Sequence, residues 1–109
     1  MEHDRVDEAI RSLPVQNKAI LLAVSMFNGG TNTGELYVAY SNLCKKIGVE
    51  TLTQRRMSGI LGDLDLLGLV EASVVSKGRR GRTKKIQLLI GKDALEKTFS
   101  EDTTFGAAA

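Results

Sequence analysis

The sequence predicts an α+β domain, mainly α, in which three helices are followed by a β-hairpin. Residues 53–68 repeat apolar side chains every three or four positions, which is the spacing of one helix face. Residues 69–76 and 83–90 instead read as strands, with turn residues between them. Two further helical segments, at residues 14–28 and 33–47, precede this stretch. The order predicts a winged helix-turn-helix, with a three-helix core, a β-hairpin wing, and flanking N- and C-terminal helices.

The composition fits a single domain with an aliphatic core. The chain has 109 residues, of which 42% are hydrophobic and none is tryptophan. This is enough for one core but not for two. We expect residues 1–13 to form an entering linker or helix, residues 14–100 the winged-helix domain, and residues 101–109 a flexible tail. The polar start and the closing Gly106-Ala-Ala-Ala indicate a domain excised from a longer protein.

The expected location follows from what the sequence lacks. There is no recognisable signal peptide, and the longest apolar run, around residues 19–24, is too short to span a bilayer. Cys44 is the only cysteine and occupies an apolar helix position, which favours a reducing compartment and a place in the core over a role as nucleophile. We therefore expect a soluble cytoplasmic protein that is associated with the nucleoid and has no membrane partner.

The first two predicted helices lie at residues 1–12 and 14–28. Residues 1–12 read as a short amphipathic helix that enters the domain. Pro14 suits the first turn of the next helix. The centre of that helix, residues 19–24, is apolar on nearly every side, so it should lie buried in the middle of the fold.

The next helix is predicted from its two ends. Residues 29–34 read as a loop by composition, and Thr33 can cap the helix that follows. Gly48 is expected to end it. Lys45 and Lys46 fall in its last turn, where helix-end electrostatics are the favoured explanation and contact with phosphate is the alternative.

Residues 53–68 are predicted to form the central functional helix. Thr53 can act as its N-cap, and Gly68 supplies a left-handed stop. Its buried face is expected to hold Met57, Ile60, Leu61, Leu64 and Leu67. The opposite face carries Arg55, Ser58, Gly59 and Gly62, with Gln54 and Arg56 on its flanks.

The two glycines inside this helix need an explanation. Each interior glycine costs a helix roughly 1 kcal/mol relative to alanine. Close approach by a DNA strand or another backbone would explain Gly59 and Gly62, and so would accommodation of a neighbouring helix. The sequence leaves both explanations open.

The hairpin carries a block of positive charge. Between its strands and in the second strand lie six basic residues and no acidic one: Lys77, Arg79, Arg80, Arg82, Lys84 and Lys85. Such a single-sign block predicts a surface for phosphate, and a solvated charged loop is the alternative. Charge is uneven along the chain, since residues 1–50 hold five basic and six acidic side chains, whereas residues 51–109 hold ten and seven.

Catalysis by this chain is not predicted, and no cofactor is expected in it. The sequence has no phosphate-binding loop, no paired cysteines, no zinc-protease pattern and no Ser/His/Asp set. His3 is the only histidine and lies near a terminus, so it does not support a metal site. Asp63 and Asp65 are two apart on a helix and read as solvated surface. Asp93 is expected to cap a last helix that serves packing.

Several fragments taken together resemble a known family. They are Leu13-Pro14, Thr33-Gly-Glu-Leu-Tyr37, Leu43-Cys44, Leu52-Thr-Gln-Arg-Arg56, Leu64-Asp-Leu-Leu-Gly68 and Gly78-Arg-Arg-Gly-Arg-Thr83. In this order, over about residues 5–100, they resemble the C-terminal winged-helix domain of the archaeal replication initiators, which are relatives of the origin recognition complex's first subunit and of the cell division control protein Cdc-six. One departure is Gln16, where the family commonly has histidine. This position is expected on the first helix, so it puts no DNA contact in doubt.

The resemblance implies sequence-specific binding of double-stranded DNA at origin repeats. In the family, an AAA+ module that binds ATP and magnesium precedes this domain, and the proteins help load the minichromosome maintenance helicase. That module is absent here, so neither nucleotide binding nor helicase loading is expected of this chain alone. The residues that match the start of the family's recognition helix are Thr53, Gln54, Arg55 and Arg56, and those that match its wing are Arg79, Arg80, Gly81 and Arg82.

We expect the recognition helix to enter the major groove, where arginine pairs best with guanine and glutamine with adenine. Arg55, with Gln54 and Ser58, would face base edges, and Arg56 would contact phosphate. The wing would hold the backbone or enter the minor groove through Lys77, Gly78, Arg79, Arg80, Gly81, Arg82 and Lys84. Two alternatives remain: a protein-docking module, and a transcriptional regulator, although regulators usually bind as dimers and no long dimerisation helix is visible.

Overall fold

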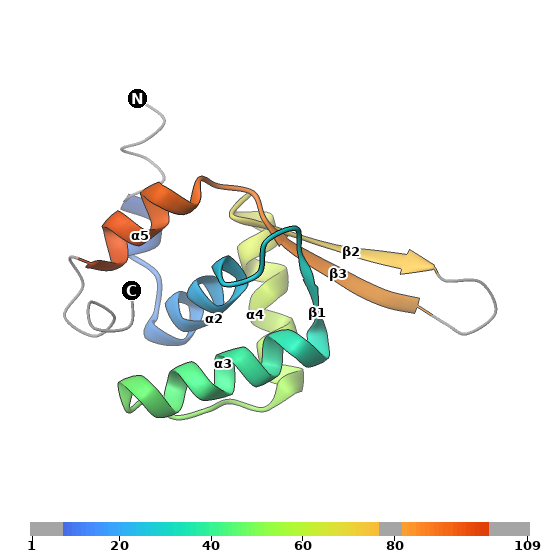
Figure 1. Cartoon of the computed structure of the whole chain (residues 1–109), viewed down its shortest axis with the longest axis horizontal. Coiled ribbons are helices and arrows are strands. Elements are labelled where there is room, and N and C mark those ends of the chain that lie inside the picture. Colours follow the sequence, from blue (N-terminus) through green and yellow to red (C-terminus); the bar gives the residue numbers. More distant parts are fainter. Residues whose placement is uncertain (1–7, 77–81, 101–109) are drawn as a thin grey trace.

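Three helices and a hairpin follow one another along the chain, as the sequence predicts. The computed structural model describes residues 8–76 and 82–100 (Figure 1). Its elements are α2 (Val15–Ser25), β1 (Thr31–Asn32), α3 (Thr33–Ile47), α4 (Gln54–Leu66), β2 (Val70–Ser76), β3 (Arg82–Leu88) and α5 (Lys92–Ser100). A short helical stretch at residues 8–11 precedes α2. The predicted fold class, a winged helix-turn-helix with flanking helices, is confirmed.

Helix α2 lies at the centre of the core, as its apolar sequence predicts. Residues 19–25 are all buried, and α3, α4 and β3 all contact α2. Each of these neighbours contributes a fully buried side chain, for example Leu36, Leu61 and Ile86. Cys44 is also fully buried, which confirms its predicted place in the core. In the described part of the chain, no helix is both long enough and apolar enough to cross a membrane.

The hairpin extends away from the helical body (Figure 1). Strands β2 and β3 pair in antiparallel register from Val70↔Leu88 to Ser76↔Arg82. At the root of the hairpin, the amide of Leu89 donates a 3.0 Å hydrogen bond to the carbonyl of Leu69. The strands are therefore joined to the helices at one end only, and the loop at residues 77–81 lies outside the described residues.

The expectation of a plain loop over residues 29–34 is wrong. The two residues of β1 pair with Ile86 and Lys85, so the sheet has three strands in the order β1-β3-β2. Two residues are too few to produce the alternation that reveals a strand in a sequence. Gly30 has a φ of +104°, and a Cβ there would lie 3.2 Å from the carbonyl oxygen of Ile86. Glycine is therefore required where the chain enters the sheet.

The cap of α3 is Asn32 rather than Thr33. Asn32 Oδ1 accepts a 2.8 Å hydrogen bond from the amide of Glu35, and Thr33 is the first helical residue. Both residue types are good caps, so the sequence alone does not distinguish them. The Glu35 carboxylate accepts a further 3.2 Å bond from the hydroxyl of Thr31. Gly48, with a φ of 74°, ends α3 as predicted.

Two other predicted helix boundaries differ from the structure. Helix α2 ends at Ser25 rather than at residue 28, because the amides of Met26 and Phe27 bond to carbonyls only three residues back, which closes the last turn. Asp93 lies inside the first turn of α5 instead of preceding the helix. A carboxylate in that turn still interacts favourably with the helix dipole.

Candidate nucleic-acid interface

The first turn of α4 gathers the residues predicted to begin the recognition helix. Thr53 Oγ1 accepts a 3.2 Å hydrogen bond from the amide of Arg56, which confirms the predicted cap and satisfies one of the free donors at a helix start. The side chains of Gln54, Arg55 and Arg56 are all exposed. No acidic residue lies in this turn, so two arginine charges coincide with the positive end of the helix dipole.

Three buried side chains fix the face that α4 presents to solvent. Met57, Leu61 and Leu64 are fully buried against the core. Ser58, which the sequence places on the outer face, is only half-buried rather than fully exposed. Leu67, predicted on the buried face, is 55% exposed, because it follows the last residue of α4. Gly68 then turns the chain into β2 with a left-handed φ of 76°, as predicted.

Gly59 and Gly62 leave a bare strip on the exposed side of α4. A Cβ built at either position would meet no atom within 4 Å, and neither residue has a positive φ. Accommodation of a neighbouring helix is therefore the wrong explanation for these glycines. Close approach by the backbone of a ligand stays a prediction.

A hydrogen-bond network fixes the segment that leads into α4. The hydroxyl of Tyr40, on α3, accepts a 3.0 Å bond from the amide of Leu52 and donates to Oε1 of Gln16, on α2. Gln16 Nε2 donates to the carbonyl of Glu50 at 2.7 Å. The hydroxyl of Tyr37 donates to the carbonyl of Leu52 at 2.8 Å. Two core helices thus hold the turn that positions the first turn of α4.

Burial raises the pKa of Tyr40 to about 12, and the neighbouring Cys44 thiol acts in the same direction, whereas the bond from the Leu52 amide lowers it. The phenol is therefore neutral at physiological pH and can donate and accept at once. From the sequence, Gln16 is only a departure from a family pattern, and Tyr40 is expected only as one of the apolar-face residues of its helix, with no hydrogen-bond partner. Two tyrosines three positions apart on one helix are the only signal of this network, and they do not reveal their partners.

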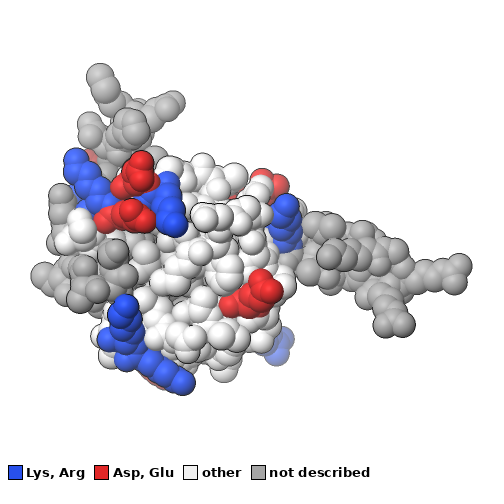
Figure 2. Space-filling view, in the orientation of Figure 1, with Lys and Arg blue, Asp and Glu red and all other residues white. Residues whose placement is uncertain are grey.

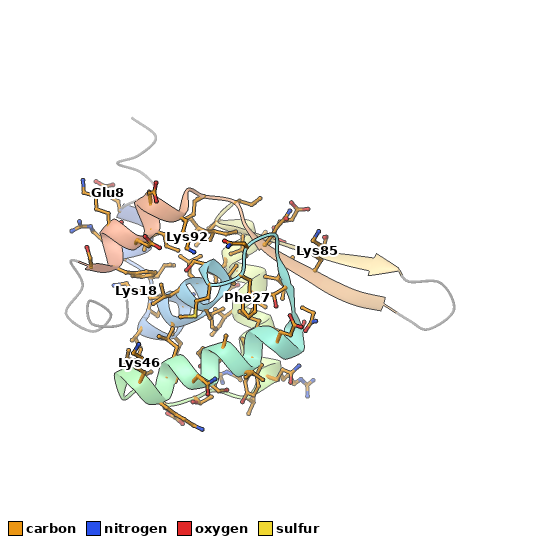
Figure 3. The ribbon with its side chains drawn as sticks, viewed as in Figure 1. Glu8, Lys18, Phe27, Lys46, Lys85 and Lys92 are labelled. Atoms are coloured by element: carbon orange, nitrogen blue, oxygen red, sulfur yellow. The ribbon has the colours of Figure 1, made fainter. Side chains whose placement is uncertain are left out.

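Only part of the predicted wing falls within the described residues. Lys77, Gly78, Arg79, Arg80 and Gly81 lie outside them. Arg82 and Lys84 belong to β3, where they pair with Ser76 and Val74 of β2. Lys85, also on β3, is exposed near the root of the hairpin (Figure 3). The hairpin predicted to carry the wing is therefore confirmed, while contacts of the wing with DNA stay a prediction.

The sequence predicts that Asp65 is solvated helix surface, but in the structure its side chain also makes a hydrogen bond within the protein. Its Oδ2 accepts a 3.2 Å hydrogen bond from the amide of Ala72 in β2. Asp63, two positions earlier on α4, is exposed. Within residues 8–76 and 82–100, no three His, Cys, Asp or Glu side chains come together as a possible metal site. The two aspartates thus belong to different surroundings, one of them at the junction of helix and hairpin.

The face drawn in Figure 2 carries charges of both signs. Basic side chains lie at the end of α3, where Figure 3 labels Lys46, and at the root of the hairpin, where it labels Lys85, with acidic side chains between them. Lys45 and Lys46 are exposed in the last turn of α3. Their position agrees with a favourable interaction with the helix dipole. Because both side chains are exposed, contact with a phosphate remains the alternative.

Similarity to known proteins covers almost the whole chain. Residues 8–98 match the family described as CDC6, C terminal winged helix domain. The chain is 44% identical to ORC1-type DNA replication protein 4 of Haloarcula marismortui over 97% of its length, and 43% identical to ORC1-type DNA replication protein 1 of Aeropyrum pernix over 94%. It spans only 21% and 27%, respectively, of the lengths of those two relatives.

Solved structures show the same fold. The Aeropyrum pernix ORC1 protein in complex with DNA matches with a TM-score of 0.90 at 40% identity, over 99% of this chain and 29% of that chain. Drosophila ORC bound to DNA matches with a TM-score of 0.70 over 84% of this chain and 24% of that chain, and at 18% identity it supports the fold alone. The match over residues 8–98 and the identity to the ORC1-type proteins show that the chain belongs to the CDC6 C-terminal winged-helix domain family.

Proposed function

We propose that this chain binds double-stranded DNA sequence-specifically at replication origins, as the C-terminal domain of a replication initiator. The observation that carries the proposal is the first turn of α4, where Arg55 and Arg56 are exposed. The Thr53 side chain caps this turn, and Tyr40 bonds to the segment that precedes it. Recognition helices of this fold present their N-terminal residues to base edges in the major groove. The similarity to the Aeropyrum pernix ORC1 protein, which was solved with DNA, supports the choice of ligand.

The proposed contacts are of two kinds: contacts to base edges, which specify sequence, and contacts to the DNA backbone, which position the protein. Arg55, with Gln54 and Ser58, reads base edges, because arginine and glutamine form paired hydrogen bonds with guanine and adenine. Arg56 contacts phosphate at the rim of the groove. The hairpin holds the adjacent backbone or minor groove through Lys77, Gly78, Arg79, Arg80, Gly81, Arg82 and Lys84, and such contacts position the protein more than they specify sequence.

The proposal extends to the longer protein that the family resemblance implies. The chain covers about a quarter of its curated relatives, and we infer that an AAA+ module with ATP and magnesium precedes this domain. In that protein, residues 14–100 bind DNA, while the expected linker and tail at residues 1–7 and 101–109 lie outside the described residues. The full-length protein would act in the cytoplasm, at the nucleoid, with its own AAA+ domain and the minichromosome maintenance helicase as partners.

The test is a titration of this domain onto a labelled origin-repeat duplex and a scrambled one, followed by fluorescence anisotropy across a salt series. Neutralisation of about four phosphates gives a slope of log K against log salt near −3.6. We expect the origin duplex to bind more tightly. A single module buries only about 600 to 1,000 Å² on DNA, so the series should start at low salt. Equal affinity for the two duplexes would exclude origin specificity, and no binding to either would exclude DNA reading.

The docking alternative also has an observation in its favour. Leu66, Leu67 and Leu89 are 88%, 55% and 51% exposed. They lie at the end of α4 and at the root of the hairpin, where the Leu89 amide bonds to Leu69. Contiguous exposed apolar side chains are typical of protein-binding surfaces, and Leu66 and Leu67 are adjacent in the chain. If neither duplex binds, this surface is where a protein partner should be sought.

A further inference from the structure

Strand β2 is an edge strand, and the junction between α4 and β2 gives one of its outward amides a partner. In the order β1-β3-β2, β3 covers only one side of β2. Residues of an antiparallel strand direct their amides alternately toward the partner strand and away from it. The amide of Ala72 bonds to Asp65 Oδ2 at 3.2 Å, so it belongs to the outward set. The carboxylate thus occupies a site where another strand could otherwise pair.

Asp65 holds both sides of the junction between helix and hairpin. Its backbone carbonyl accepts a 2.9 Å hydrogen bond from the amide of Gly68, in the turn that ends α4. Its side chain accepts the bond from Ala72, two residues into β2. The same residue therefore bonds both to the turn that ends α4 and to strand β2.

Small rotations at this junction become large displacements at the far end of the hairpin. Strands rise about 3.3 Å per residue, so Ser76 lies roughly 20 Å from Val70 along β2. A rotation of about 10° at the root would then move the far end by roughly 3 to 4 Å, which is enough to break a hydrogen bond to phosphate. The hairpin is anchored at its root, so its direction depends on the contacts made there.

We propose that Asp65 is a positioning residue that aims the hairpin relative to α4, so that both elements contact one DNA site. This inference rests on the proposed function. Two surfaces that are already correctly oriented bind a shared ligand more tightly than two surfaces that must be ordered on binding.

The experiment compares Asp65→Ala with Asp65→Asn, and uses Asp63→Ala and Asp63→Asn as charge-matched controls. Each variant removes one negative charge from α4, but only Asp65→Ala removes the acceptor for Ala72. We expect Asp65→Ala to bind the origin duplex about five-fold more weakly than Asp63→Ala, because a hairpin no longer held by this bond must be ordered when DNA binds. Asp65→Asn should bind like Asp63→Asn, because its amide oxygen can still accept.

A second comparison separates an effect on the direction of the hairpin from an effect on the stability of the whole domain. In a protein that also carries Arg79→Ala and Arg80→Ala, the difference between Asp65→Ala and Asp63→Ala should fall below about two-fold, since a wing without these charges gains little from its direction. Hydrogen exchange at the Ala72 amide, measured by nuclear magnetic resonance, should accelerate in Asp65→Ala and not in Asp65→Asn. This measurement follows the bond itself in the absence of DNA.

The outcomes distinguish this inference from the proposed function. If the unchanged protein binds neither duplex, both the proposed function and the role of Asp65 are overturned. If the unchanged protein prefers the origin duplex but Asp65→Ala binds as tightly as Asp63→Ala, only the role of Asp65 is overturned. A five-fold loss that persists at full size without the wing arginines would also overturn it, because the loss would then not arise from the hairpin.

Discussion

Arg55 and Arg56 are neighbours in one turn of α4, yet they are not equivalent. Successive residues of a helix are separated by about 100° around its axis, so the two exposed arginine side chains leave the helix in different directions. Both are free of nearby acidic side chains in their turn. One can therefore lie over base edges while the other reaches the phosphates at the rim.

This division gives a prediction for single substitutions. Arg55→Ala should cost about 1 to 3 kcal/mol on the origin duplex and reduce its preference over the scrambled duplex. Arg56→Ala and Arg80→Ala should instead weaken both duplexes alike and reduce the salt slope by about 1 each. Anisotropy titrations of the three variants measure both quantities. Identical behaviour of Arg55→Ala and Arg56→Ala would contradict the assignment.

Tyr40 stabilises the fold while its phenol is protonated. Its pKa is about 12 in the folded protein and about 10 in an unfolded chain. The raised pKa means that this stabilisation is fully present below about pH 10 and is lost as the pH rises toward 12, by up to about 2 to 3 kcal/mol.

The titration of Tyr40 can be measured alone, because Tyr37 is the only other tyrosine. In Tyr37→Phe, ultraviolet absorbance of tyrosinate should show a midpoint near 12 while circular dichroism confirms that the helices persist. The same variant in denaturant should titrate near 10. A midpoint near 10 in the folded variant would mean that Tyr40 is not buried in the network described.

At the scale of elements, α4 contains two glycines, which are unfavourable in a helix, and both lie at exposed positions. Its bounds are predictable because Thr53 and Gly68 give chemical start and stop signals at the two ends. The environment of Gly59 and Gly62 is not predictable, since only the fold reveals that no neighbour lies against them. Destabilising residues at exposed positions suggest a functional reason, and close approach by DNA is the one that we expect.

Substitution of the strip should separate stability from binding. Gly59→Ala and Gly62→Ala should each stabilise the fold by about 1 kcal/mol in urea unfolding, because the added methyl group meets nothing and helix propensity rises. If DNA approaches the strip, both should also weaken DNA binding. Gly34→Ala, at an exposed helical position of α3 outside the strip, serves as control and should leave binding unchanged. Stabilised variants with unchanged affinity would show that DNA does not contact the strip.

At the scale of the whole molecule, the order of elements and the central position of α2 follow from apolar periodicity and from helix start and stop residues. Contacts between a side chain and a distant backbone do not, because they leave no repeating signal in the sequence. The bond from Leu52 to Tyr40 and the bond from Ala72 to Asp65 are of this kind. The sequence therefore predicts which surface is presented, while the residues that orient it are visible only in the fold.

Strand β1 has a consequence for the order in which the domain folds. Its two residues pair with Ile86 and Lys85, and the chain between them includes α3, α4 and β2. Closing so long a loop costs entropy that two paired residues offset poorly, whereas the helices and the hairpin form from local contacts. We therefore expect the sheet to be completed late in folding and to open early in unfolding. Because Asn32 belongs to β1 and caps α3, we expect the first turn of α3 to become more stable in that step.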